Sequence, residues 1–78
     1  PNPFNPVTSF RVSIPSTANI YISIFDIKGR EILTLLNQKM YKGHYVIKWD
    51  ATNYVAGIYF VQLKSKNYIM NKKIILLK

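Results

Sequence analysis

Few side chains in this sequence could carry out acid–base or nucleophilic chemistry, and they lie far apart. The chain has one histidine, His44, and three acidic residues, Asp26, Glu31 and Asp50. It has no cysteine, so no thiolate can act as a nucleophile or as a zinc ligand. An active site needs titratable groups that converge, and a zinc site needs three or four ligands. The sequence therefore predicts a protein that is not an enzyme and that needs no metal or other cofactor.

The same residues have simpler structural interpretations. His44 follows Gly43 where we expect a strand to begin, so we interpret its ring as capping or packing against that strand. Asp26 and Asp50 each follow a predicted strand and precede a turn, where aspartate often accepts hydrogen bonds from nearby backbone. The three glycines are widely spaced and form no phosphate-binding loop.

The charge of the chain is strongly basic, with eleven Lys and Arg against three acids and a net charge of +8. Such a balance favours anionic partners. Aromatic rings interleaved with lysines could also stack on nucleic-acid bases. The candidates for such stacking on the non-core side are Tyr21, Phe25, Tyr41, Tyr54 and Tyr68. The lysines are scattered, however, which suits solubility and the protection of edge strands, so nucleic-acid binding is disfavoured.

Hydrophobic residues alternate with a period of two along most of the chain, as in strands with one buried face. The predicted core positions are Phe10, Val12 and Ile14, then Ile20, Ile22 and Ile24, then Tyr45, Ile47 and Trp49, and finally Tyr59, Val61 and Leu63. Turn residues separate these runs at intervals of about 10 residues, which is typical of β-sandwiches. The sequence predicts an all-β antiparallel sandwich of six or seven short strands.

Two segments depart from this regular alternation. In residues 31–40 the apolar positions fit a helix about as well as a strand. We favour an irregular or bulged strand there, because no capping residues frame a helix and the neighbouring elements are strands. At the end of the chain we expect two β segments, 68–70 and 74–77, separated or bulged at 71–73.

The length of 78 residues predicts a single domain over 1–78. Three prolines in the first six residues exclude a helix, so we expect an extended Pro/Asn-rich segment over 1–7 with Phe4 as an anchor. No run reaches the roughly 20 apolar residues that span a bilayer. The chain begins with Pro1 and has no signal peptide, so we expect it to be the tail of a longer protein, cut out or processed, whose upstream part would carry any export signal.

Short motifs punctuate the chain in a definite order. They are Pro1-Asn2-Pro3-Phe4-Asn5-Pro6, Asp26-x-x-Gly29-Arg30, Gly43-His44 leading to Trp49-Asp50, Gly57-Ile58-Tyr59-Phe60 followed by Leu63, and the terminal Lys73-Ile74-Ile75-Leu76-Leu77-Lys78. In this order, over the whole chain, they resemble the C-terminal sorting domain of the type IX (Por) secretion system. That family is related in fold to the immunoglobulin-like domain of the flagellar hook-assembly protein. The resemblance therefore implies an immunoglobulin-like sandwich.

The resemblance also implies a function and a set of partners. Such a domain is a non-catalytic signal that directs an N-terminal cargo through the periplasm and across the outer membrane, to the cell surface or the medium. It docks on the outer-membrane translocon and its shuttle protein. A sortase often removes it and can attach the cargo to anionic lipopolysaccharide. The alternative is an immunoglobulin-like spacer or adhesive module of a larger extracellular protein, and a carbohydrate- or nucleic-acid-binding module ranks third.

Most of the landmark residues are expected to be structural. These are Pro3, Phe4, Asn5, Pro6, Asp26, Gly29, Arg30, Gly43, Trp49, Asp50, Gly57, Tyr59 and Leu63. The terminal apolar run has two interpretations: a core strand with charged ends, or an edge strand that a receptor reads by its side chains or by strand addition. For the second interpretation, the predicted translocon-recognition residues are Lys73, Ile75, Leu77 and Lys78.

Overall fold

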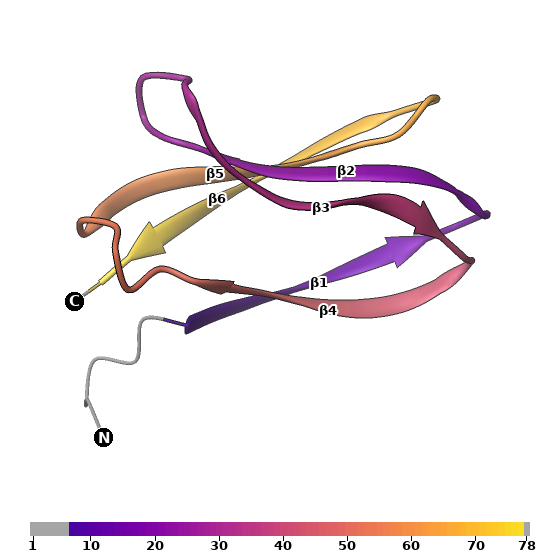
Figure 1. Ribbon diagram of the computed structural model, residues 1–78, viewed down its shortest axis with the longest axis horizontal. Helices are drawn as coiled ribbons and strands as arrows, with labels where there is room; N and C mark the ends of the chain where they lie inside the picture. The colour runs from indigo at the N-terminus through magenta and orange to yellow at the C-terminus, as the bar shows by residue number, and fades with distance from the viewer. Residues whose placement is uncertain (1–6, 78) are drawn as a thin grey trace.

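The computed structural model describes residues 7–77, and within them it contains six strands and no helix (Figure 1). The strands are β1 (Val7–Ile14), β2 (Ala18–Phe25), β3 (Glu31–Met40), β4 (Gly43–Asp50), β5 (Gly57–Lys64) and β6 (Ile69–Leu76). The all-β prediction is therefore confirmed. Val7, at the end of the predicted N-terminal segment, is the first residue of β1. The landmarks in residues 1–6 and Lys78 lie outside the described residues.

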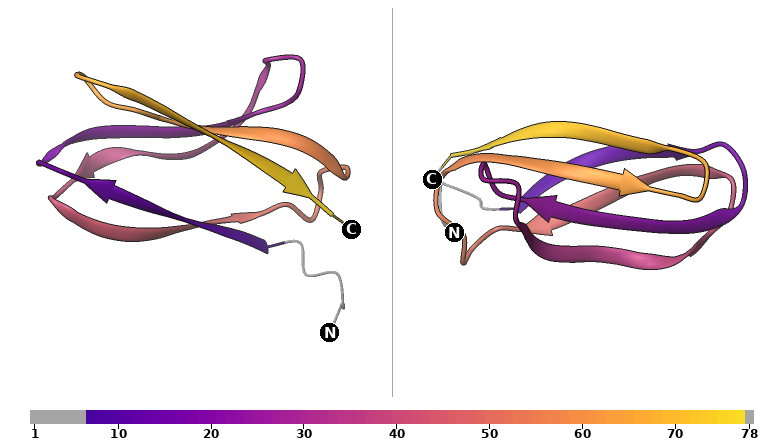
Figure 2. Two further views of the ribbon diagram at one scale, coloured as in Figure 1. Left: turned by 180° about the vertical axis from the view of Figure 1, so that it is seen from behind. Right: turned by 90° about the horizontal axis from the view of Figure 1, so that it is seen from above.

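The strands form two antiparallel sheets of unequal size. One sheet holds only β1 and β4, and the other has four strands in the order β3-β2-β5-β6. Figures 1 and 2 show the two sheets facing one another as the layers of a sandwich. The antiparallel pairing of β1 with β4 places the start of β1 beside the end of β4. Figure 1 shows that β6 ends at the same end of the sandwich.

The core lies where the inward rows of the two sheets meet. The residues of β2 that face inward, Ile20, Ile22 and Ile24, are completely buried, and the inward row of β5 is nearly so. Phe10, Ile14 and Trp49 close the core from the smaller sheet, with Val12, Tyr45 and Ile47 packed half-buried around them. The core positions predicted from alternation in these four strands are thus confirmed.

β3 is a strand with two irregularities in its pairing, as favoured from the sequence. Its register against β2 shifts between Ile22 and Ser23 and again between Ile24 and Phe25. As a result Leu36 pairs with Ile22 and Leu33 pairs with Ile24, so residues three apart in β3 meet residues two apart in β2. A bulged strand holds one extra residue, which explains why the apolar spacing of this segment imitates a helix.

β6 differs from the prediction of two separated segments. It is one continuous strand, and it pairs with β5 from Ile69 opposite Lys64 to Leu76 opposite Gly57 without a register shift. The expected break at 71–73 is wrong because strand pairing uses backbone groups, and the regular strand β5 is a continuous template for them. The polar side chains of 71–73 are tolerated because β6 lies at a sheet edge and they reach solvent.

The central position of β2 makes its inward side chains the most sensitive part of the fold. We expect Ile24→Ala to lower the free energy of unfolding by about 2–5 kcal/mol, since it opens a cavity in a closed core. A domain of this size has a total stability of roughly 5–10 kcal/mol, so the variant should lose a large share of it and unfold at a clearly lower urea concentration than wild type. Urea denaturation followed by tryptophan fluorescence measures this loss.

Val46→Ala is the matched control, because Val46 lies on the exposed face of β4. It should change the free energy of unfolding by no more than about 0.5 kcal/mol. Equal losses for the two variants would contradict the placement of the core on β2.

Candidate functional site

The landmark residues Asp26, Gly29 and Arg30 form one turn between β2 and β3. The Asp26 backbone N–H donates to the Arg30 carbonyl at 2.9 Å, and the Gly29 N–H donates to the Asp26 carbonyl at 3.0 Å. The Asp26 carboxylate accepts hydrogen bonds from the backbone N–H groups of Lys28 and Arg30, and it pairs with Arg30 Nε at 2.9 Å. Gly29 has a φ of +83°, which glycine adopts without strain. The three residue types are therefore explained by the geometry of the turn.

These contacts lower the pKa of Asp26 below its ordinary value of 3.8. The largest cause is the hydrogen bond from the Arg30 backbone N–H; the Arg30 side chain and the Lys28 N–H act in the same direction, while desolvation opposes them. Each donor stabilises the charged carboxylate over its neutral form. The turn thus depends on an ionised Asp26.

Trp49 lies in the interior and not on a binding surface. It is fully buried, and its ring meets Tyr59 edge-on at a centroid distance of 5.2 Å and Tyr54 at 5.4 Å. The Tyr59 hydroxyl donates to the Val55 carbonyl at 2.6 Å, which ties the loop between β4 and β5 over this cluster. Asp50 accepts hydrogen bonds from the backbone N–H and the hydroxyl of Thr52 at the start of that loop. The Trp49 ring is therefore closed to a ligand such as a sugar.

Of the remaining landmarks, Gly43 and Gly57 begin β4 and β5, and Leu63 lies in the core. His44 is on the exposed face of the smaller sheet, where its Nδ1 lies 2.9 Å from the Ser13 hydroxyl on the neighbouring strand. A Ser–His pair is part of a nucleophilic triad only when an acid orients the histidine. Among the described residues no carboxylate accepts a hydrogen bond from His44, nor do they contain a cluster of His, Asp and Glu that could hold a metal.

The aromatic residues considered for stacking on nucleic acid do not form one surface. Tyr54 and Tyr68 pack against the core, which corrects their assignment to the non-core side. Tyr21 donates to Glu31 on the outer face of the larger sheet, while Tyr41 is exposed in the turn after β3 with Lys39 over its ring. These positions offer no continuous row of rings for successive bases.

Of the predicted recognition residues, Lys73 and Ile75 lie on the outward side of β6, Leu77 directly follows the strand, and Lys78 lies outside the described residues. Ile74 and Leu76 face the core and are 8% and 4% exposed, whereas Ile75 and Leu77 are 62% and 75% exposed. Lys73 pairs with Phe60, and Ile75 pairs with Ile58, on the outer face of the sheet. β6 thus combines the two interpretations given by the sequence: it contributes to the core with one face and presents apolar side chains to solvent with the other.

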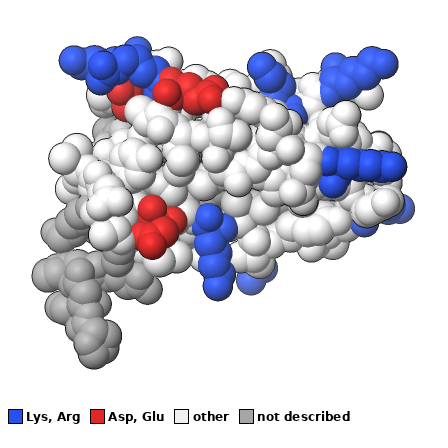
Figure 3. Space-filling model, viewed as in Figure 1, with Lys and Arg blue, Asp and Glu red and all other residues white. Residues whose placement is uncertain are grey.

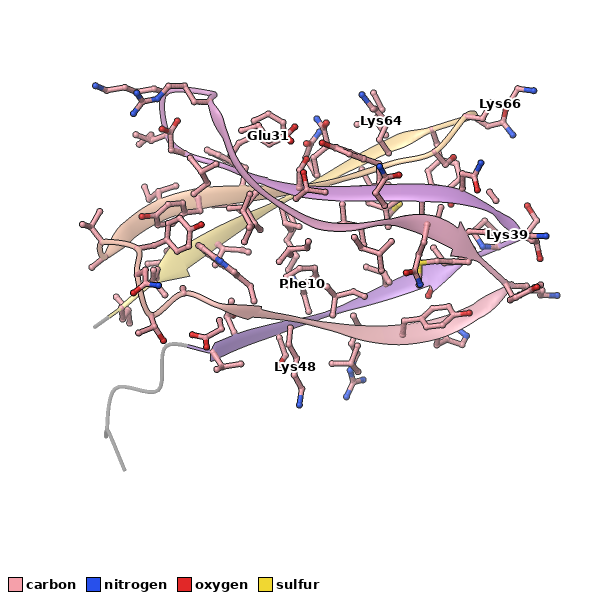
Figure 4. The ribbon with its side chains drawn as sticks, viewed as in Figure 1. Phe10, Glu31, Lys39, Lys48, Lys64 and Lys66 are labelled. Atoms are coloured by element: carbon pink, nitrogen blue, oxygen red, sulfur yellow. The ribbon has the colours of Figure 1, made fainter. Side chains whose placement is uncertain are left out.

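The three acids lie at one end of the sandwich, together with Lys28 and Arg30 of the β2–β3 turn, whereas other lysines lie toward the opposite end (Figures 3 and 4). Asp26 and Glu31 flank the β2–β3 turn and Asp50 ends β4, all at the end where β1 begins. The opposite end carries Lys39 and Lys66, with Lys64 between this end and the middle, as Figure 4 shows, together with Lys42 in the β3–β4 turn. The domain is therefore basic mainly at the end away from its two described termini.

A cleft between β1 and β6 was missed from the sequence. It has a volume of about 320 Å³, and its lining includes Met70 and Lys72 of β6. The alternation Met70, Lys72, Ile74, Leu76 would have put these two side chains on the inward face, had the strand been taken as continuous. Because a break was predicted at 71–73, the alternation was not followed across these residues.

Comparison with known proteins decides the family. A family model described as the secretion system C-terminal sorting domain matches residues 1–77. The chain belongs to this family. No curated protein and no solved structure matches it significantly.

The sorting domain is the C-terminal signal for type IX secretion, so it marks an exported protein for the cell surface or the medium beyond the outer membrane. The resemblance, the fold class and the function predicted from the sequence are thereby confirmed, and nothing supports the spacer alternative better. Domains of this family are in general non-catalytic. The described residues contain no helix that is long and apolar enough to cross a membrane.

The ionised Asp26 leads to a prediction about acid stability. The pKa of Asp26 is lower in the folded state than in the unfolded state. Asp26 therefore stabilises the folded state fully at pH values above 3.8, and this stabilisation is lost as the pH falls through the folded-state pKa. We expect Asp26→Asn to reduce the free energy of unfolding at neutral pH, and the difference from wild type to shrink in acid. Urea denaturation across this pH range gives both values.

Lys28→Gln is a matched control for this experiment, since it alters one charge in the same turn and leaves the Lys28 backbone N–H in place. It should follow the wild-type pH profile. A gap between wild type and Asp26→Asn that stays constant down to the lowest pH would show that the Asp26 charge does not stabilise the turn.

Proposed function

We propose that the outward face of β6, with Lys73, Ile75 and Leu77, is the surface by which the type IX translocon recognises this sorting domain. The observation that carries the proposal is the exposure of Ile75 on the edge strand β6 and of Leu77 directly after it. Lys78, which follows them in the sequence and lies outside the described residues, belongs to the same proposed set.

The fold does not require apolar side chains at these two positions. Ile74 and Leu76 already attach β6 to the core, and Ile75 and Leu77 point away from it. An exposed apolar edge strand is a liability that proteins normally avoid with charges, short strands or covering loops. Retaining two large aliphatic residues there is understandable if a receptor covers them.

The backbone of β6 supports the same proposal. β6 pairs only with β5 among the described strands, so its outer edge offers unpaired N–H and C=O groups. A receptor strand could add to this edge, with main-chain hydrogen bonds supplying affinity and the side chains of β6 supplying specificity.

We further infer the wider context of the domain from its family. Residues 1–78 form one domain, joined through its N-terminus to a cargo that reaches the periplasm by its own export signal. A shuttle protein and the translocon bind the domain, and a sortase removes it. The domain itself carries out no catalysis. Its positive charge would favour contact with anionic lipopolysaccharide, to which the cargo is attached.

The proposal predicts the behaviour of a secreted reporter. Residues 1–78 are fused to a fluorescent protein with a signal peptide, in a host with type IX secretion. We expect the wild-type fusion to reach the cell surface or the medium. The variant Ile75→Ser with Leu77→Ser should accumulate in the periplasm, with secretion reduced about tenfold or more, because two central contacts are lost.

Val46→Ser is the matched control, since Val46 is as exposed as Ile75 but lies on the other sheet. It should be secreted like wild type. Thermal denaturation of the purified chains must show all variants folded, as expected for exposed positions. A folded double variant secreted at the wild-type level would exclude the outward face of β6 as the recognition surface.

A further inference from the structure

The cleft between β1 and β6 exists because these two strands approach each other at one end of the sandwich and diverge toward the other end. In Figures 1 and 2, β6 ends near the start of β1 and diverges from β1 toward its own first residues. Side-chain burial follows this divergence. On the inward face of β6, Leu76 and Ile74 are buried, whereas Met70 is 56% exposed and Lys72 is also exposed.

The cleft has an apolar floor and an open backbone edge. Ile22, Val61 and Leu63 of the larger sheet form the floor, and residues 10–13 of β1 form one wall. Among the described strands, β1 pairs only with β4, so its other edge faces this cleft without a partner strand. Every second residue of such an edge presents unpaired backbone groups that can accept another strand.

The charges of the cleft have one sign. Arg11 and Lys72 are among its lining residues, and none of the residues that line it is acidic. Lys72 points inward from an edge strand, which discourages pairing with apolar or basic strands. The net charge of +8 likewise disfavours a second copy of this chain as the occupant.

We propose that this cleft accepts an extended segment of a partner protein in which apolar residues alternate with Asp or Glu. The segment pairs with the free edge of β1 and adds a third strand to the smaller sheet. Its apolar side chains cover Met70 and the floor of the cleft. Its acidic side chains lie on the opposite side of the segment, the side of Arg11, and the long side chain of Lys72 reaches them around the open edge of the segment. This surface is separate from the outward face of β6 and goes beyond the recognition proposed above.

A peptide of eight residues in which Val alternates with Glu tests this, with a Val–Lys peptide of equal length for comparison. We expect fluorescence anisotropy to show binding of the Val–Glu peptide to the 78-residue chain and no comparable binding of the Val–Lys peptide. Bound peptide should slow amide hydrogen exchange in residues 10–13 of β1. Lys72→Glu should weaken binding of the Val–Glu peptide about tenfold, as for other close interfacial charges.

Lys66→Glu makes the same change of charge in the β5–β6 turn, outside the residues that line the cleft, and should leave the affinity near the wild-type value. If Lys72→Glu does not fold, Lys72→Gln replaces it, and we expect its affinity for the Val–Glu peptide to lie between those of wild type and Lys72→Glu. The proposal is overturned if Lys66→Glu weakens binding as much as Lys72→Glu. Protection along β3 or the outer edge of β6, with none on β1, also overturns it, as does dimerisation of the chain through β1.

The double variant Ile75→Ser with Leu77→Ser separates this proposal from the previous one. Its affinity for the Val–Glu peptide should equal that of wild type, whatever its secretion. A loss of peptide affinity in that folded variant would mean that the peptide binds on the outward face of β6 and not in the cleft.

Discussion

A sheet of two strands cannot cover a sheet of four, and this mismatch governs the structure. Neighbouring strands lie about 4.8 Å apart, so the smaller sheet is narrower than the surface it faces by roughly two strand spacings. The core forms where the sheets overlap, over β2 and β5, whose inward rows are the most completely buried. The flanking strands β3 and β6 are buried less well. Each strand of the smaller sheet has one edge without a partner among the described strands.

The outward face of β6 and the cleft between β1 and β6 both result because the smaller sheet covers only part of the larger one. β6 approaches the core only in its second half, through Ile74 and Leu76, and this anchors the strand while its outward face stays in solvent. Its first half diverges and leaves Met70 and Lys72 over an open cleft. A complete sandwich of seven or more strands would cover such a cleft. The domain therefore combines a small closed core with two apolar surfaces that partners could cover.

The sequence predicted those parts of the fold in which each strand keeps its own regular alternation. The core rows of β1, β2, β4 and β5 follow from the period of two, because each of these strands has one face toward the core. β3 and β6 were harder to predict, because the form of each strand depends on the strand with which it pairs. The bulges of β3 are defined only by its register against β2, and the polar residues 71–73 continue a strand only because β5 pairs with them. Register of this kind cannot be obtained from the alternation of one segment alone.

The landmark motifs illustrate the same limit for function. Asp26, Gly29 and Arg30 meet in one turn, and Trp49 and Tyr59 meet in one aromatic cluster, so their residue types have local physical reasons. Such residues are typical of the family because they maintain its turns and its core. The exposure of Ile75 and Leu77, by contrast, became visible only once their neighbours Ile74 and Leu76 were placed in the core.

The excess of positive charge completes the physical account of these open surfaces. Asp26 is bound within its turn, Glu31 accepts from Tyr21 and Thr34, and Asp50 accepts from Thr52, so all three acids have local roles. The surplus of lysines is therefore not matched by acids, and exposed ion pairs would add little stability in any case. Their effect is mutual repulsion between copies, which protects the unpaired outer edges of both sheets from pairing with those of another copy. The same positive charge repels other copies of the chain and attracts acidic partners, and salt limits both effects to separations of about 10 Å.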